Sequence, residues 1–312
     1  MSFSFSDFSA AVRAGGRISA EDVIAVRREI WPDGAVSDAE AESLFEIHRS
    51  ASDPGPEWAA FFIEAMCEHV VNGKAPRGYV DDSGAAWLID QIDRDGSPDG
   101  PGARAAIDLE LVAKVLDTAL NCPASLKSWA LRRIEASVAS DGRVGGDETK
   151  LLRRIVLACG GEGALAVSSE EAESLWRIKD VCLHAENDPG WKTLFVQAVA
   201  NHLMAYSSYR PLEREEAARL EAFVNDSSSS VLGFLARMRD SKFGDALRQA
   251  REDLLESEPS AADHDKAVDG AHAVEPGEKR WLDGRVDADG ARDPYEEALL
   301  AFIADEGRPS AD

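Results

Sequence analysis

The chain has 312 residues, of which 34 are Lys or Arg and 58 are Asp or Glu, so its formal net charge is −24. This excess of acid repels nucleic acid and anionic membranes, and we expect neither as a partner. No stretch approaches the ~18 apolar residues of a membrane helix, and the first residues lack a signal-peptide pattern, so we expect a cytoplasmic protein.

Helix start signals recur along the chain, whereas strand signals are nearly absent. Ser19, Ser37 and Ser168 each stand three residues before an acid, which is the spacing of a helix capping box. A fourth start at Gly145 has lost the serine but keeps its acid, and Gly-containing turns precede most of these starts. The sequence therefore predicts an all-α fold. The cysteines lie mostly in apolar helical patterns, which is typical of reduced thiols: they are Cys67, Cys122, Cys159 and Cys182.

One apolar helix pattern occurs twice in the chain with the same steps of three and four residues. The first copy is Trp58, Phe61, Phe62, Ala65, Met66, His69 and Val70, and the second is Trp191, Leu194, Phe195, Ala198, Val199, His202 and Leu203. Upstream, the run Ala41-Glu42-Ser43-Leu44 returns at residues 172–175. We therefore predict an internally duplicated multi-helix array, with two four-helix units joined by bridging helices.

The predicted parts follow one another without overlap. They are a first helical unit at 18–95, bridging helices at 103–140, a second unit at 144–226, a C-terminal helix at 231–256, a disordered linker at 257–278 and docking helices at 279–305. A Trp-Leu pair at Trp87 recurs at Trp281, each time before a cluster of aspartates and a glycine.

Two of the Asp-Gly turns resemble the calcium loop of an EF-hand, in which acids at defined positions surround the ion. The loop 285–296 has acids at the third, fifth, ninth and twelfth positions, but Arg285 stands at the first. The loop 91–102 has acids at the third, fifth and ninth positions, with Gln91 at the first. The candidate ligands for calcium or another divalent cation are Asp287, Asp289, Asp293, Glu296, Asp93, Asp95 and Asp99. The alternative interpretation is that these acids stabilise helix N-termini and connect helices.

Catalytic signatures are missing from the sequence, including nucleophile, zinc-protease and phosphate-loop motifs. His69 and His202 occupy the same place in the two repeats, on apolar helix faces. We expect both to be packed and hydrogen-bonded rather than to bind zinc.

The run Ala139-Ser140-Asp141-Gly142-Arg143-Val144 followed by Glu148 resembles a turn of the TerB-like tellurite-resistance group. More of the chain resembles a set of alphaproteobacterial helical proteins, in the segments Trp191–Asn201, Arg77–Val80 and Trp281–Gly290. The TerB-like resemblance implies a helical fold, divalent-cation binding and a link to stress response.

Three functions are open at this point. The first is a non-enzymatic, cation-binding or stress-associated TerB-like protein. The second is a helical adaptor that binds a protein partner through a groove between repeats, as helical arrays often do. The third is a metal-dependent enzyme.

Overall fold

The computed structural model describes residues 5–15, 17–30, 35–94, 103–158, 167–204, 276–286 and 291–306. Within these ranges the chain forms twelve α-helices and no strand, which confirms the all-α prediction. No helix of the described ranges is long and apolar enough to cross a membrane. The helices are α1 (Phe5–Gly15), α2 (Ala20–Ile30), α3 (Asp38–Ser50), α4 (Gly55–Asn72), α5 (Asp82–Asp93), α6 (Ala103–Thr118), α7 (Ala124–Asp141), α8 (Gly146–Leu157), α9 (Ser169–Cys182), α10 (Pro189–Met204), α15 (Pro276–Val286) and α16 (Pro294–Glu306).

The predicted capping boxes form at the starts of α2, α3 and α9. At α3 the Ser37 hydroxyl accepts from the Glu40 backbone N–H, while the Glu40 carboxylate accepts from the Ser37 N–H at 2.8 Å. The same reciprocal bonds occur at Ser168 and at Ser19. At α8 only half of the box can form, because Gly145 has no side chain; its N–H still donates to Glu148. These bonds satisfy N–H groups that a helix start otherwise leaves unpaired.

The turn between α7 and α8 uses a glycine in the left-handed region. Gly142 has φ +70°, and its N–H donates to the Val138 carbonyl at 2.7 Å, which ends α7. A side chain at this φ would be strained, so the Asp-Gly pair here serves the helix connection.

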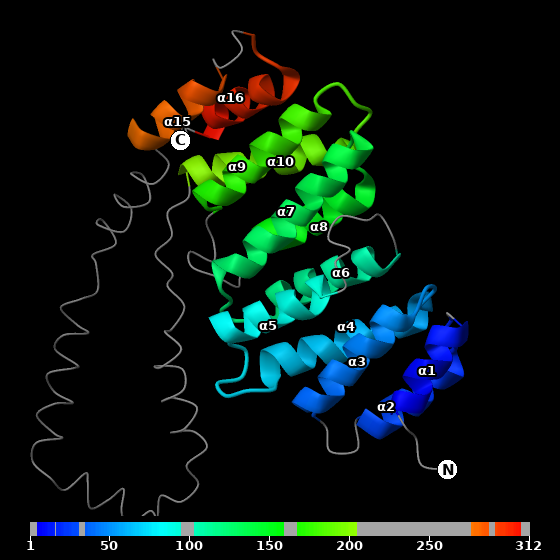
Figure 1. The fold of residues 1–312 in the computed structure, drawn as a ribbon. Helices are drawn as coiled ribbons and strands as arrows, with labels where there is room; N and C mark the ends of the chain where they lie inside the picture. The colour runs from blue at the N-terminus through cyan, green and yellow to red at the C-terminus, as the bar shows by residue number, and fades with distance from the viewer. Residues whose placement is uncertain are drawn as a thin grey trace, which may run out of the picture.

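The helices stack in successive layers, from α1 and α2 at one end to α15 and α16 at the other (Figure 1). The packing partners recur in the same order along the chain: α1 contacts α3, α2 contacts α4 and α4 contacts α6, while α7 contacts α9, α8 contacts α10 and α10 contacts α16. We call α1–α6 the first half of the molecule and α7–α16 the second half. The two helices predicted as a bridge, α6 and α7, thus lie in different halves, because α6 packs on α4 and α7 packs on α9. Between the halves, α6 also contacts α7 and α8, and α5 contacts α7.

The two copies of the apolar pattern make matching contacts. The Nδ1 atoms of His69 and His202 each lie 2.8 Å from a backbone oxygen, of Val36 and Val167 respectively. Their rings pack against Trp87 at 5.2 Å and Trp281 at 5.4 Å between centroids. Both histidines are therefore packed and hydrogen-bonded as predicted. The duplication itself stays a prediction, and these contacts are what it would produce.

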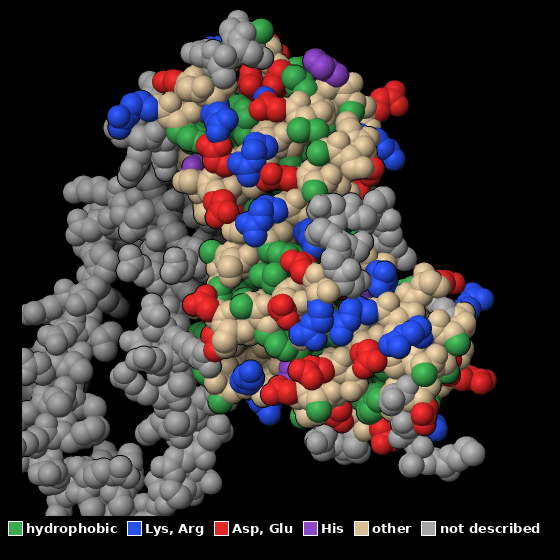
Figure 2. All heavy atoms as spheres, in the orientation of Figure 1, with side chains coloured by type: hydrophobic (Ala, Val, Ile, Leu, Met, Phe, Trp, Pro, Cys, Tyr) green, Lys and Arg blue, Asp and Glu red, His purple; other side chains and the backbone are tan. Residues whose placement is uncertain are grey.

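Apolar side chains from every layer join into one buried core, in which Trp58, Trp176 and Trp191 are among the largest side chains. On the surface, acidic and basic side chains lie next to each other over the face shown in Figure 2. Pairs such as Arg177 with Glu135, at 2.7 Å, connect neighbouring helices. The predicted segment 231–256 and residues 257–275 of the predicted linker lie outside the described residues, and the last three linker residues, 276–278, belong to the start of α15.

Candidate functional site

Two of the predicted cation ligands, Asp293 and Glu296, lie at the start of α16 and form its capping box. The Asp293 carboxylate accepts from the backbone N–H groups of Tyr295 at 2.7 Å and Glu296 at 3.0 Å. The Glu296 carboxylate accepts from the Asp293 N–H at 3.2 Å. Their spacing of three residues is therefore explained by helix capping, the alternative interpretation of this turn.

The same two carboxylates bind a buried ammonium group. Lys179 Nζ on α9 lies 2.5 Å from Asp293 Oδ2, 2.9 Å from Glu296 Oε1 and 2.9 Å from Asp180 Oδ1. The Lys179 side chain is only 2% exposed, and its Nζ lies 4.8 Å from the centroid of the Trp176 ring. The lysine thus supplies the positive charge that a bound cation would otherwise bring, and it anchors α16 to α9.

The ionisation of this cluster follows from its geometry. Burial by itself would lower the pKa of Lys179, but the hydrogen bonds to Asp293, Asp180 and Glu296 outweigh burial and raise this pKa above its ordinary value. Burial would raise the pKa of Asp293, but the bond from Lys179 and the backbone N–H donors lower it. Both groups are therefore held in their charged forms at neutral pH.

A third predicted ligand, Asp93 at the end of α5, is bound by side chains of α7. Its carboxylate accepts from Trp129 Nε1 at 3.1 Å and pairs with Arg133, whose guanidinium lies 4.9 Å from the Trp129 ring centroid. The other four candidates, Asp287, Asp289, Asp95 and Asp99, lie outside the described residues. Within the described part of the chain, no group of three or more His, Cys, Asp or Glu is arranged to hold a metal ion. Divalent-cation binding stays a prediction.

His48 occupies the place in α3 that Lys179 occupies in α9, when the repeated Ala-Glu-Ser-Leu runs are aligned. It is 1% exposed, its Nε2 lies 3.2 Å from Asp108 on α6, and its Nδ1 accepts from Trp58 Nε1 at 3.2 Å. An indole N–H can only donate, so the ring proton of His48 belongs on Nε2. The sequence reasoning missed both His48 and Lys179, although each is a polar residue on an apolar helix face.

The described cysteines are unsuited to covalent chemistry. Cys67, Cys122 and Cys182 are buried and unbridged. Burial raises the pKa of all three thiols, and that of Cys122 to about 12. A thiol held in its protonated form is a poor nucleophile.

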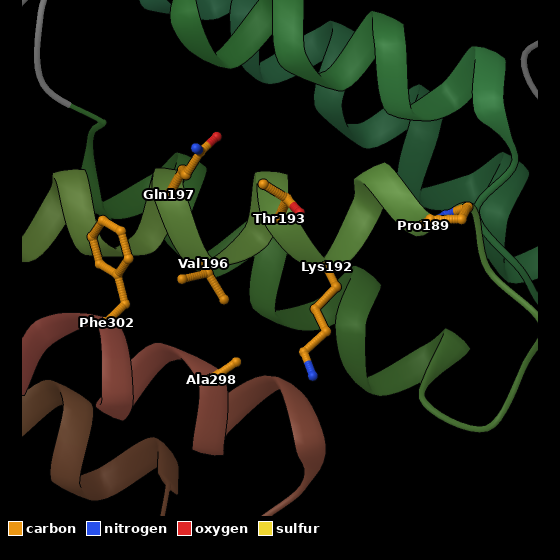
Figure 3. A pocket seen from close by; sticks show the side chains of 7 residues that line it. All are labelled: Pro189, Lys192, Thr193, Val196, Gln197, Ala298 and Phe302. Carbon is orange, nitrogen blue, oxygen red and sulfur yellow. The ribbon is translucent and has the colours of Figure 1, made fainter. Parts of the chain in front are cut away.

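A groove lies between α10 and α16, and we call it the α10–α16 groove (Figure 3). It has a volume of about 300 Å³ and is lined by Pro189, Lys192, Thr193, Val196, Gln197, Ala298 and Phe302. The five α10 residues recur at steps of three and one, so they form one helix face about 12 Å long at 1.5 Å per residue. Val196 and Ala298 lie on opposite sides of the gap, and Lys192 extends from α10 toward α16.

Comparisons of the chain with protein-family models, with curated proteins and with solved structures find no match. The resemblance to TerB-like proteins therefore stays a prediction.

Proposed function

We propose that the chain is a non-enzymatic helical adaptor that holds a partner helix in the α10–α16 groove. The groove carries this proposal, because it is open, is as long as two helical turns and has apolar side chains on both of its helices. A small-molecule site would need several polar groups that converge on one ligand. Here Thr193 and Gln197 point away from α16 (Figure 3), and Gln197 already accepts from Arg153 at 3.4 Å.

The first half of the molecule supports a helix as the occupant. There α8 packs on α6, and Arg154 of α8 pairs with Glu110 and with Asp117. Aligning Asp108, which pairs with His48, on Glu296, one of the three acids that pair with Lys179, places Glu110 at Ala298. The groove therefore includes Ala298, the residue aligned with Glu110, and α8 packs on α6 of the first half at Glu110.

Cation binding is the weaker candidate function. The described ligands Asp293, Glu296 and Asp93 are already neutralised by Lys179 and Arg133. A divalent ion would have to displace these ion pairs, and the pairs of Lys179 are buried. A metal-dependent enzyme is the weakest candidate, because within the described residues no group of three or more His, Cys, Asp or Glu supports a metal site.

The adaptor proposal is tested with a yeast-displayed library of 18-residue amphipathic helices. Helices that are selected on the wild-type chain should lose binding to Phe302→Glu, which puts a charge on the partly buried apolar side of the groove. The matched control is Leu300→Glu, since Leu300 is also partly buried on α16 but does not line the groove. Thermal unfolding of both variants checks that they fold. Selected helices that ignore Phe302→Glu, or that are lost only with Leu300→Glu, would contradict the proposal.

A further inference from the structure

His48 is a buried imidazole whose two ring nitrogens have opposite roles. Its Nε2 lies 3.2 Å from the Asp108 carboxylate of α6, and its Nδ1 accepts from Trp58 Nε1 of α4 at 3.2 Å. Imidazole is the side chain that ordinarily changes its charge between about pH 5 and 8. A second proton on this ring would have to bind Nδ1, the atom that accepts from the indole, because Nε2 already carries a proton.

A proton on Nδ1 is incompatible with the bond from Trp58. An indole N–H can only donate, so two N–H groups would face each other and the bond would be lost. Trp58 is completely buried, so its N–H cannot turn to water instead. The Phe62 ring of α4 stacks on the imidazole at 4.1 Å between centroids and limits how far the imidazole can move. The charge of His48 therefore decides whether α3 and α4 share this hydrogen bond.

The charged groups around His48 mostly favour its protonated form. From α6, the carboxylate of Asp108 would form an ion pair with an imidazolium. On α3 itself, His48 lies in the last turn, where the helix dipole favours a positive charge. The neighbouring Arg49 and, from α6, Arg104 oppose the charge. Their guanidinium groups donate to the backbone oxygens of Gln91 on α5, at 3.2 Å, and of Arg49, at 2.8 Å, instead of to the imidazole.

The second half of the molecule has a permanent positive charge at the aligned position. There the Lys179 ammonium takes the place of His48 and binds two acids at the start of α16, as an imidazolium would bind its acid on α6. The indole of Trp191, which aligns with Trp58, has no nitrogen or oxygen acceptor among the described residues. A buried cation and an indole N–H without such an acceptor thus occur together in the second half.

We infer that His48 is a pH-sensitive switch inside the first half. Near neutral pH the ring is uncharged and accepts from Trp58. In mild acid it takes up a proton at Nδ1, pairs as an imidazolium with Asp108 and releases the indole N–H. The bond between α3 and α4 is then lost while the connection between α3 and α6 becomes an ion pair, as in the second half. The switch does not depend on the adaptor function, because none of its groups lines the α10–α16 groove.

The test follows the indole N–H signals of the full-length chain by proton–nitrogen NMR between about pH 8 and 5. The Trp58 signal should titrate together with the ring nitrogen signals of His48, whereas the Trp191 signal should stay in place. His48→Gln should abolish this titration, because an amide oxygen still accepts from the indole but takes up no proton. Asp108→Asn should move the titration about 1–3 pH units lower, because the imidazolium loses its ion pair.

The outcomes decide between a switch and a fixed hydrogen bond. Circular dichroism over the same range identifies the pH at which the chain unfolds. A Trp58 signal that stays constant down to that pH would overturn the inference, and so would a titration that persists in His48→Gln. If His48→Gln does not fold, the ring nitrogens of His48 in the wild-type chain give the answer. Proton uptake at Nδ1 together with movement of the Trp58 signal supports the switch, and uptake without such movement refutes it.

Discussion

The two halves of the molecule place different polar groups at the same buried position. In the first half His48 bonds one acid on α6 and one indole on α4. In the second half Lys179 binds two acids at the start of α16 and one neighbouring acid on α9. Both groups connect the second helix of a pair to the last helix of its half. The comparison teaches that two similar helix arrangements can be connected internally by different side-chain chemistry.

The largest expected effect comes from removing the charge at the centre of the second half. Lys179→Met would leave Asp293 and Glu296 without their cation, and we expect the free energy of unfolding to fall by about 3–5 kcal/mol. Urea unfolding followed by circular dichroism measures it. The matched control is Lys150→Met, which removes a fully exposed pair with Asp147 and should cost far less. Equal costs would mean that the cluster adds nothing beyond a surface pair.

The same cluster should make stability depend on pH at both extremes. The pKa of Asp293 is lowered below 3.8, so its contribution is present above that pH and is lost as pH falls through the folded pKa. The pKa of Lys179 is raised above 10.5, so its contribution is full below that pH and is lost as pH rises further. The stability difference between wild type and Lys179→Met should be constant near neutral pH and shrink below about pH 3.8. A difference that grows in acid would contradict the assignment.

A smaller effect should distinguish Trp58 and Trp191, the tryptophans that begin the two matching apolar patterns. The Trp58 N–H donates to His48, whereas the Trp191 N–H has no nitrogen or oxygen acceptor in the described residues and faces only the Cys182 sulfur. Both Trp→Phe substitutions lose similar apolar area. Trp58→Phe also leaves the His48 Nδ1 without a donor, so it should cost about 1–3 kcal/mol more in the free energy of unfolding. Equal losses in paired urea titrations would show that the His48 bond contributes little.

The smallest expected effect is that of divalent cations. A site saturated 100-fold above its dissociation constant would add about 2.7 kcal/mol, or several degrees in unfolding midpoint for a chain of this size. Because Lys179 and Arg133 already neutralise the described candidates, we expect millimolar calcium or magnesium to shift the midpoint by less than about 1 °C relative to EDTA. A larger shift that Asp289→Asn removes would support the EF-hand-like prediction and weaken the adaptor proposal.

Local patterns predicted the helices and their starts well. The spacing of Ser37 and Glu40 shows a capping box because both groups of the bond lie within one turn. The apolar steps around Trp58 and Trp191 identify the faces that are buried. The predicted EF-hand-like spacing has a local cause too, since Asp293 and Glu296 cap α16.

The contacts of the site could not be predicted in the same way. Lys179 and Asp293 are 114 positions apart, and no periodicity connects them. The α10–α16 groove exists only because α16 packs on α10, after a long stretch of intervening sequence. A signal was nevertheless present, because the repeated Ala-Glu-Ser-Leu run aligns His48 with Lys179 and marks both as polar residues on an apolar face.

The sequence distances of the two internal connections affect synthesis on the ribosome. His48 needs Asp108, 60 positions later, whereas Lys179 needs Asp293 and Glu296, 114 and 117 positions later. At about 5–20 residues per second, the first connection can form about 3–12 s after His48 is made, and the second only about 6–23 s after Lys179. During synthesis, Lys179 and the apolar surface of α10 therefore stay uncovered roughly twice as long as His48 does. We expect chaperones to bind the nascent second half mainly during this interval, because its apolar surface is then exposed.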